Sequence, residues 1–239
     1  QMSRAAAKWI LRNTLVSRES ITPELTLRLI TEASPLWMAT PAHCPLADPY
    51  WAFYWPGGQA VTRWLLDNAS SAVRGAALLD LGAGCGSATL AAIAGSSADV
   101  IVNDIDENAL LATRLNARLN GVPTTTARFS TANLLAGGVD GVEQFFKQRD
   151  RRLNILGDMF YDTDFAGRLF DWLKRVQKGC GARVIVGDPD RHPLVEQLHL
   201  DGYKTKYDSA NVYSNCLPGY SQREHYGFSS AHVYELEFV

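Results

Sequence analysis

The sequence predicts an α/β fold with a largely parallel central sheet that ends in an antiparallel pair of strands. Between residues 76 and 201, apolar strand-like segments alternate with helix-like segments. This alternation is typical of parallel strands joined by right-handed crossovers. The last expected strand, His232 to Phe238, follows a long polar loop at 211–229 and not a helix. We therefore expect it to pair antiparallel with a strand near 203–209 at one edge of the sheet.

The hydrophobic period of the chain places the remaining elements in order. One or two helices are expected over residues 4–31, the second beginning at Thr22-Pro23-Glu24, which is a helix-start pattern. A Pro-rich aromatic loop over 35–58 and a helix from Gln59 to about Asn68 follow. The further strands are expected at 76–82, 99–104, 125–130, 152–157 and 182–187. The further helices are expected at 86–95, 106–120, 163–178 and 192–201, and a short helix is expected with the Gly-broken segment of Gly137, Gly138 and Gly141.

Length and composition fit one compact unit. The chain has 239 residues, of which 46% are hydrophobic, enough to fill a sizeable core. We expect residues 1–58 to form an extension that packs on a core domain at 59–239. The net charge of −2 gives no global basic field, which disfavours a nucleic-acid partner. No apolar run is long enough to suggest a membrane span.

Cysteine and histidine spacing predicts neither a metal site nor a disulfide scaffold. Cys44, Cys85, Cys180 and Cys216 are far apart and form no C-x-x-C pair. The five histidines also lack the spacing of metal ligands; they are His43, His192, His199, His225 and His232.

The N-terminal segment allows two interpretations. Residues 1–18 contain four basic residues and no acidic one, and they are rich in Ala and Ser. This composition is typical of a mitochondrial transit segment or of the residues that follow one. The alternative is an amphipathic helix of the folded protein, with Trp9, Ile10 and Leu15 facing inward.

A glycine-rich turn follows the strand at 76–82. Gly82, Gly84 and Gly86 let the backbone turn sharply and leave room for a ligand to approach it. The next strand ends at Asp104, 24 residues after Asp80. An acidic residue at this spacing can accept hydrogen bonds from ribose hydroxyls. Together, the turn and the acid predict a nucleoside cofactor, whereas a turn without a ligand is the alternative.

The glycine spacing distinguishes between possible cofactors. A dinucleotide site has the pattern G-x-G-x-x-G, but here the glycines run G-x-G-x-G and residue 87 is Ser. Asp80 lies just before the turn, where a carboxylate would repel a pyrophosphate but could pair with an amino or sulfonium group. The pattern resembles the S-adenosyl-L-methionine (SAM) site of the seven-strand methyltransferases. An NAD-dependent dehydrogenase is the disfavoured alternative.

A second candidate site follows the strand at 152–157. That strand delivers Asp158 and Tyr161 at its carboxyl end, where ligands bind in open α/β sheets. The DNA adenine methyltransferases have Asn/Asp-Pro-Pro-Tyr here, and this chain lacks both prolines. Asp158-Met159-Phe160-Tyr161 instead resembles the Asp/Glu-x-x-Tyr/Phe motif of the seven-strand protein lysine methyltransferases. The alternative is a strand end whose polar residues only cap the next helix.

An aromatic segment before the core domain strengthens this resemblance. Residues 50–55 contain five aromatic side chains, which is too dense for an ordinary surface loop. Some of these rings could simply cap the edge of the sheet. The turn Trp55-Pro56-Gly57-Gly58, however, resembles the Trp-Pro-Ser-Gly element of the same methyltransferases, which closes over SAM.

These motifs together resemble the Rossmann-like, class I seven-strand protein lysine methyltransferases, and within them the branch that acts on the electron transfer flavoprotein β subunit. The resemblance runs from about residue 22 to residue 189 and is weak at 136–150 and 211–229. It implies SAM as the cofactor, lysines near the flavoprotein's partner-recognition loop as the substrate, and the mitochondrial matrix as the location, or the cytoplasm for a bacterial protein. The alternatives are a methyltransferase of another protein, such as a ribosomal protein, and a SAM-binding module without catalysis.

The resemblance and the residue chemistry together assign roles to the candidate residues. Asp158 is expected to orient the ε-amine of a substrate lysine. Tyr161 and Phe160 are expected to offer aromatic faces to a methylammonium group. Trp55 is expected to cover the cofactor, and Asn133 to hydrogen-bond the adenine amine.

Overall fold

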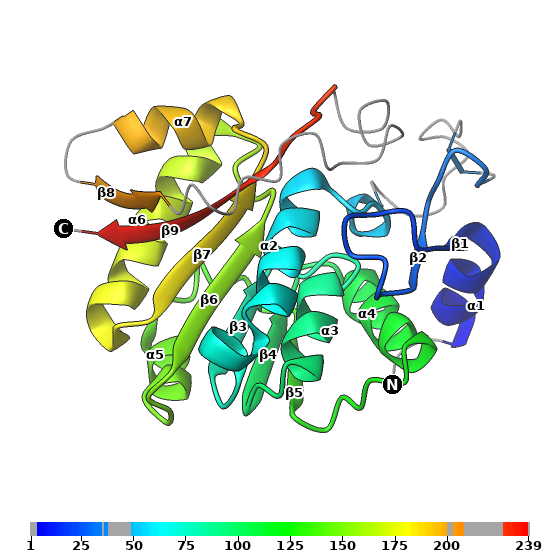
Figure 1. The fold of residues 1–239 in the computed structure, drawn as a ribbon, viewed down its shortest axis with the longest axis horizontal. Coiled ribbons are helices and arrows are strands. Elements are labelled where there is room, and N and C mark those ends of the chain that lie inside the picture. Colours follow the sequence, from blue (N-terminus) through cyan, green and yellow to red (C-terminus); the bar gives the residue numbers. More distant parts are fainter. Residues whose placement is uncertain (1–3, 35, 38–48, 200–202, 208–226, 239) are drawn as a thin grey trace.

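A seven-stranded sheet with helices on both faces forms the centre of the structure, a computed structural model (Figure 1). The described residues are 4–34, 36–37, 49–199, 203–207 and 227–238, with only the backbone described for 203–207. The predicted loops at 35–58 and 211–229, together with Cys44, Cys216, His43 and His225, therefore lie partly or wholly outside the described residues.

The order of the strands confirms the predicted α/β sheet. Across the sheet the order is β5-β4-β3-β6-β7-β9-β8, and all neighbours from β5 to β7 are parallel. β9 is antiparallel to both β7 and β8, as predicted for the terminal pair. The strands are β3 (Ala77–Leu81), β4 (Asp99–Asn103), β5 (Ala127–Ser130), β6 (Arg152–Gly157), β7 (Arg183–Asp188), β8 (Tyr203–Tyr207) and β9 (His232–Phe238).

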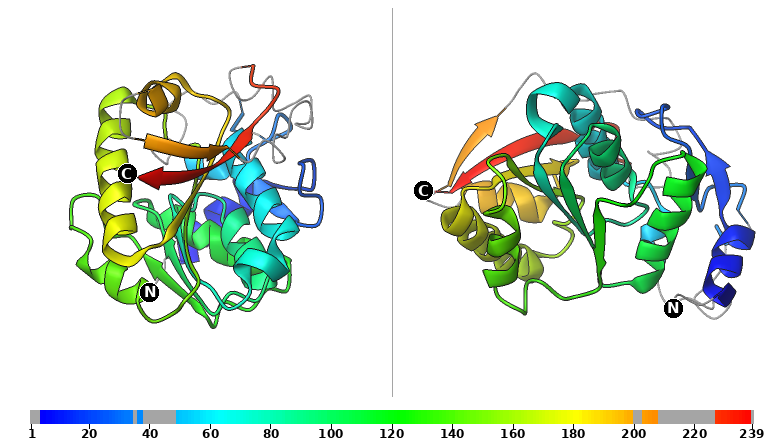
Figure 2. Two further views of the ribbon diagram at one scale, coloured as in Figure 1. Left: turned by 60° about the vertical axis from the view of Figure 1, so that its left-hand side comes forward. Right: turned by 90° about the horizontal axis from the view of Figure 1, so that it is seen from below.

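Helices cover the two faces of the sheet in two groups of three (Figure 2). Side chains of β3 alternate between them: Leu78 packs with the first group and Leu79 with the second. The first group is α2 (Pro56–Asp67), α3 (Ser87–Ala94) and α4 (Glu107–Leu119). The second group is α5 (Asp140–Phe146), α6 (Thr163–Cys180) and α7 (His192–His199). Two short turns flank α2, the 3₁₀ helix η2 (Tyr50–Ala52) and the π-helix η3 (Ala69–Val73).

The described residues before the core begin with helix α1 (Arg4–Asn13), which lies along α4 (Figure 2, right). Ile10 is fully buried against α4 in a cluster with Ala109 and Ala112. This part of the chain therefore forms an amphipathic helix of the folded protein. Leu15, which was expected to face inward, is 39% exposed because it already belongs to the strand that follows α1.

The second predicted N-terminal helix is wrong. Beyond α1 the chain forms a small antiparallel sheet of β1 (Leu15–Ser17) and β2 (Leu27–Leu29). Leu27 and Leu29 are buried and the residue between them is not, which is the two-residue period of a strand. In addition, the Arg28 amide donates a 2.8 Å hydrogen bond to the side-chain oxygen of Asn116 in α4. Burial and this bond outweigh the helix-start signal at Thr22-Pro23-Glu24.

The first turn of α2 packs directly on the carboxyl ends of β6 and β7. A Cβ atom placed on Gly187 would overlap the carbonyl oxygen of Gly57, and one placed on Gly157 would lie 2.6 Å from the Cα of Gly58. Only glycines allow this backbone-to-backbone contact. Because α2 begins at Pro56, it crosses the boundary expected at residue 58, and the division into 1–58 and 59–239 stays a prediction.

Replacement of Gly187 by alanine is expected to destabilise the fold by about 1 to 3 kcal/mol or more, because a backbone carbonyl cannot move aside for the added methyl group. Urea unfolding would measure the loss. Gly141→Ala is the matched control. A Cβ at Gly141, inside α5, meets nothing within 4 Å, so this change should be neutral or slightly stabilising. Equal stabilities of the two variants would contradict the close contact.

Candidate active site

A cleft of about 610 Å³ opens at the carboxyl ends of β3, β4 and β6. β3 has β4 on one side and β6 on the other, so the chain changes direction across the sheet at this point. Open α/β sheets bind ligands in this crevice. A shallower hollow of about 350 Å³ lies near the start of β7 around Gln177 and Glu235 and contains none of the predicted site residues.

The glycine turn after β3 forms one wall of the cleft. Gly82 and Gly84 line it with positive φ angles of +70° and +54°. A Cβ at Gly82 would overlap the sulfur of Met159, so a side chain there would also disturb the opposite wall. The Gly84 amide donates a 2.9 Å hydrogen bond to Oδ2 of Asp104. The two features from which the sequence predicted a nucleoside are thus directly connected.

Asp104 lies at the end of β4, on the floor of the cleft. Its Oδ1 accepts the Asp106 amide at 3.0 Å, while Oδ2 accepts Gly84. Each carboxylate oxygen can accept a further hydrogen bond, so Asp104 keeps acceptor capacity for hydroxyl groups. Burial raises its pKa above the usual range of an aspartate.

Two apolar side chains complete this half of the cleft. Ile105, which directly follows Asp104, is 74% exposed, and Leu134 faces the same space. An isoleucine this exposed at the edge of a largely apolar cleft fits a surface that a flat apolar group covers. Sequence reasoning missed both residues, although their positions directly after a strand end and beside Asn133 were available signals. The glycine cradle, the acceptor and these walls together fit a nucleoside such as that of SAM.

Asn133 lies at the exposed edge of the same half and lines the cleft. Its Oδ1 accepts the Ala136 amide at 3.2 Å. Asn103 holds this loop in place, because its side-chain amide donates to the carbonyls of Ser130 and Ala132 at 3.0 and 2.9 Å. Contact of Asn133 with adenine stays a prediction.

Asp80 and Gly86 do not line the cleft. Asp80 is buried beneath the turn, where its Oδ2 accepts the Thr89 hydroxyl at 2.5 Å. Gly86 directly precedes α3, and a Cβ there would lie 2.5 Å from Thr113, a neighbour in α4. Both residues support the turn from behind, and their direct contact with the cofactor stays a prediction.

Burial raises the pKa of Asp80 to about 6, so the folded state disfavours its charge. A raised carboxyl pKa gives stability that is complete below the unfolded value of 3.8 and is lost as pH rises to about 6. The Asp80→Asn variant, which never ionises and can still accept from Thr89, should therefore be more stable than wild type by about 2 to 3 kcal/mol above pH 6. Denaturant unfolding between pH 4 and pH 8 would test this. A stability difference independent of pH would refute the assignment.

Asp158 lies across the cleft from the glycine turn, directly after β6. Its backbone has a left-handed φ of +56°, and its carboxylate is almost fully buried. Oδ2 accepts the Gly58 amide at 3.0 Å. Oδ1 accepts two N–H groups of Arg191, at 3.1 and 2.8 Å. Burial raises the pKa of Asp158, and the Arg191 charge acts in the opposite direction.

Aromatic side chains line the space around Asp158. Tyr161 is 63% exposed at the rim and stacks on Phe165, with ring centroids 5.3 Å apart. Trp55 also lines the cleft, and its indole N–H donates to the carbonyl of Tyr50 at 2.9 Å. The structure thus brings Trp55, Tyr161 and Asp158 to one cleft, and cover of the cofactor by Trp55 stays a prediction.

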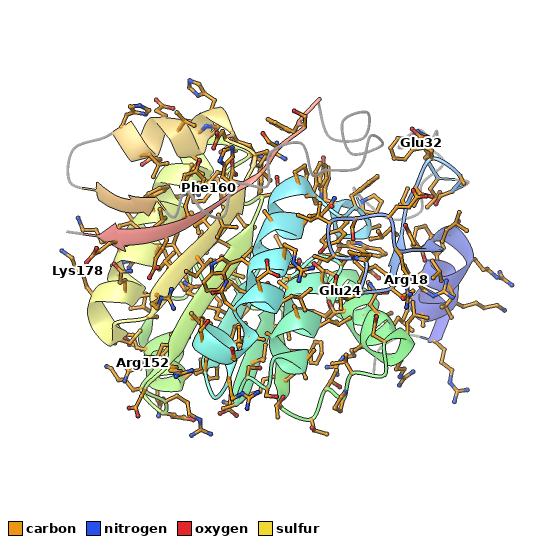
Figure 3. The ribbon with its side chains drawn as sticks, in the orientation of Figure 1. Arg18, Glu24, Glu32, Arg152, Phe160 and Lys178 are labelled. Atoms are coloured by element: carbon orange, nitrogen blue, oxygen red, sulfur yellow. The ribbon has the colours of Figure 1, made fainter. Side chains whose placement is uncertain are left out.

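The predicted role of Phe160 is wrong. Its side chain lies inside the molecule (Figure 3) and is fully buried. It packs on Phe170 of α6, with ring centroids 5.2 Å apart. Met159 and Tyr161 face the cleft, whereas Phe160 between them faces the core. The second aromatic face at the cleft comes from Phe165, in the first turn of α6.

Sequence reasoning also missed Arg191 and the contact of Gly58 with Asp158. Arg191 follows the end of β7, and the carboxyl end of a parallel strand was an available signal. The Gly58 contact joins residues 100 positions apart, and no local pattern reports it.

The described residues contain neither a cluster of metal ligands nor a helix suited to cross a membrane. No three His, Cys, Asp or Glu residues among them gather as metal ligands do. None of the helices in this part of the chain is long and apolar enough to cross a membrane. Cys85 and Cys180 are buried free thiols.

Comparisons with known proteins point to one chemistry. Residues 52–196 match the model of a family described as lysine methyltransferase. The chain is 52% identical to a Caenorhabditis elegans protein named electron transfer flavoprotein beta subunit lysine methyltransferase homolog, covering 98% of this chain and 97% of that protein. The human and mouse proteins of the corresponding name are 41% and 37% identical, over 77% and 93% of this chain and 68% and 80% of their own lengths. Among solved structures, a putative SAM-dependent methyltransferase from Streptococcus mutans has the same fold, with a TM-score of 0.53, 10% identity, and coverage of 93% of this chain and 55% of that one.

Proposed function

The chain belongs to the lysine methyltransferase family, and from this premise we propose that it methylates lysine side chains of an electron transfer flavoprotein β subunit. It is an enzyme, its methyl donor is SAM and its substrate is a protein. The names of its relatives support the choice of flavoprotein. One observation supports catalysis above all: a single cleft has the glycine turn and Asp104 on one side and Asp158 with aromatic rings on the other.

One half of the cleft suits the cofactor. The backbone of Gly82 and Gly84, the carboxylate of Asp104 and the side chains of Ile105 and Leu134 would hold its nucleoside. When bound, SAM supplies a methyl group activated by a sulfonium. The enzyme's own task is then mainly to position the nucleophile and to exclude water.

The other half suits a lysine side chain. A lysine with a pKa near 10.4 must lose a proton before it can attack, which costs about 4 to 5 kcal/mol at pH 7. We propose that Asp158 orients the ε-amine. The rings of Trp55, Tyr161 and Phe165 form apolar walls that can accept a methylated ammonium by cation–π contact, worth about 0.5 to 2 kcal/mol.

The direct test is incubation of the purified protein with radiolabelled SAM and recombinant electron transfer flavoprotein, followed by mass spectrometry. Label on lysines of the β subunit would support the proposed substrate. Label on no flavoprotein residue, with SAM binding intact, would refute that substrate and leave the family unchanged. Substrate choice would then be sought in whole-cell extracts, with ribosomal proteins as the first alternative. A protein that binds SAM but labels nothing would instead be a non-catalytic module.

A mitochondrial location stays a prediction. The basic residues at the start of the chain suggested it, but Arg4 to Asn13 form α1 and pack on α4 in the structure. This helix is part of the folded extension. A fluorescent fusion observed in cells would test the location.

A further inference from the structure

Arg191 places a positive charge in the cleft directly beside Asp158. Its guanidinium binds Oδ1 of Asp158 through two N–H groups and lines the same cleft. The side chains of Arg191 and Asp158 are only 13% and 4% exposed. The rings of Trp55 and Phe228 lie 5.9 and 5.1 Å from the guanidinium carbon. A guanidinium keeps its charge over the whole working pH range of proteins.

The loop that carries Arg191 is held at several points. The Arg191 amide donates to Oδ1 of Asp188 at 2.6 Å. Asp190, between them, accepts the hydroxyl of Tyr234 and lies 3.3 Å from Nε2 of His232, so β9 supports the loop from the neighbouring strand. The cation is therefore fixed relative to Asp158.

A lone carboxylate would be a poor neighbour for the reacting amine. It would stabilise the ammonium form of the lysine, which has no lone pair with which to attack. A carboxylate and a fixed guanidinium form a pair with no net charge, and the carboxylate oxygens of that pair can still orient the amine. The pair can thus hold the amine without favouring its protonation.

We propose that Arg191 is a positioning residue whose fixed charge neutralises Asp158, so that the substrate lysine loses its proton to water on entering the cleft. This role rests on the proposed methylation of lysine. Arg191 acts through Asp158 and need not touch the methyl donor.

The other charged groups around Arg191 and Asp158 are consistent with a pair that has no net charge. Asp188 is buried, and burial together with the Asp158 charge raises its pKa well above the usual range, so it adds less negative charge than an exposed aspartate. Asp190 is engaged by Tyr234 and His232. Among the described residues, Asp104 and Asp106 are the further carboxylates lining the cleft, and both belong to the nucleoside half.

The test compares the pH dependence of kcat in Arg191→Met, Arg191→Lys and wild type. In wild type kcat should rise with pH as the substrate lysine loses its proton. Loss of the Arg191 charge should raise the pH of half-maximal kcat by about one unit. The kcat of Arg191→Met should then be about tenfold below that of wild type near pH 7 and approach it near pH 10. The lysine variant retains a cation and should keep the midpoint closer to that of wild type. Arg175→Met, an exposed position on α6, is the matched control and should leave the profile unchanged.

A second measurement needs neither turnover nor the flavoprotein. n-Butylamine, which resembles a lysine side chain, is titrated into the enzyme with S-adenosylhomocysteine between pH 7 and pH 10. Wild type should bind the neutral amine, so its affinity should rise with pH, whereas Arg191→Met should bind the ammonium and show a level or falling affinity. The same pH dependence in both proteins would overturn the role of Arg191. Failure of wild type to label the flavoprotein would count only against the substrate proposed above.

Discussion

Replacement of Asp158 by asparagine is expected to lower the methylation rate by about 100-fold or more, with SAM affinity nearly unchanged. The variant removes the charge that pairs with Arg191 and leaves a buried guanidinium beside the amine. The neutral amide is a weaker acceptor than the carboxylate and is held by the uncompensated guanidinium, so the substrate amine loses the group that orients it. Single electrostatic groups in active sites are commonly worth about 100- to 1000-fold. Asparagine is chosen because it tolerates the left-handed φ of +56° at this position, which alanine would not.

The experiment measures initial rates with labelled SAM, and SAM binding by calorimetry. Asp140→Asn is the matched control, because Asp140 is an exposed acid at the start of α5, away from the cleft. Its rate should equal that of wild type. A full rate in Asp158→Asn would remove Asp158 from the mechanism, whereas loss of SAM binding in that variant would assign the residue to the cofactor half.

Replacement of Asp104 by asparagine is expected to weaken SAM binding by about 10- to 100-fold. One carboxylate oxygen becomes an NH₂ group, which would face either the Gly84 or the Asp106 amide donor in place of an acceptor. The variant also loses the charge in any hydrogen bond to a ribose hydroxyl, and hydrogen bonds to charged groups contribute about 1.5 to 3 kcal/mol each. Calorimetric titration of SAM measures the loss directly.

Asp171→Asn serves as the control for this second change, since Asp171 is an exposed residue of α6. At saturating SAM, Asp104→Asn should recover most of its turnover, because the residue does not face the amine. Unaltered SAM affinity in Asp104→Asn would mean that the nucleoside lies elsewhere in the cleft.

The strands of the parallel sheet, its antiparallel end and one half of the site could be predicted from the sequence because they depend on local patterns. A parallel strand brings whatever follows it to the carboxyl edge, so Gly82, Asp104 and Asp158 meet there once their strands are recognised. The bounds of β6 and β9 agree with the predicted strands at both ends.

The remaining features depend on contacts between distant segments. Arg28 donates to Asn116, 88 residues away, and this contact helps make a strand of a segment that looked helical. Phe160 turns to the core because Phe170 and its neighbours offer a large apolar space behind it. Arg191 reaches Asp158 only because β6 and β7 are adjacent. None of these partners can be read from nearby sequence.

The contact between the first turn of α2 and the ends of β6 and β7 affects how the protein forms on the ribosome. β3, β4 and the glycine turn are all synthesised before residue 105, whereas the surface on which Gly57 rests is not available until Gly187 has emerged. At about 5 to 20 residues per second, several seconds separate these two events. Until Gly187 has emerged, the start of α2 lacks the part of its packing surface that β7 provides, and Asp158 lacks Arg191. The residues that line the cofactor half are therefore all synthesised before Arg191, which completes the half that would hold a lysine.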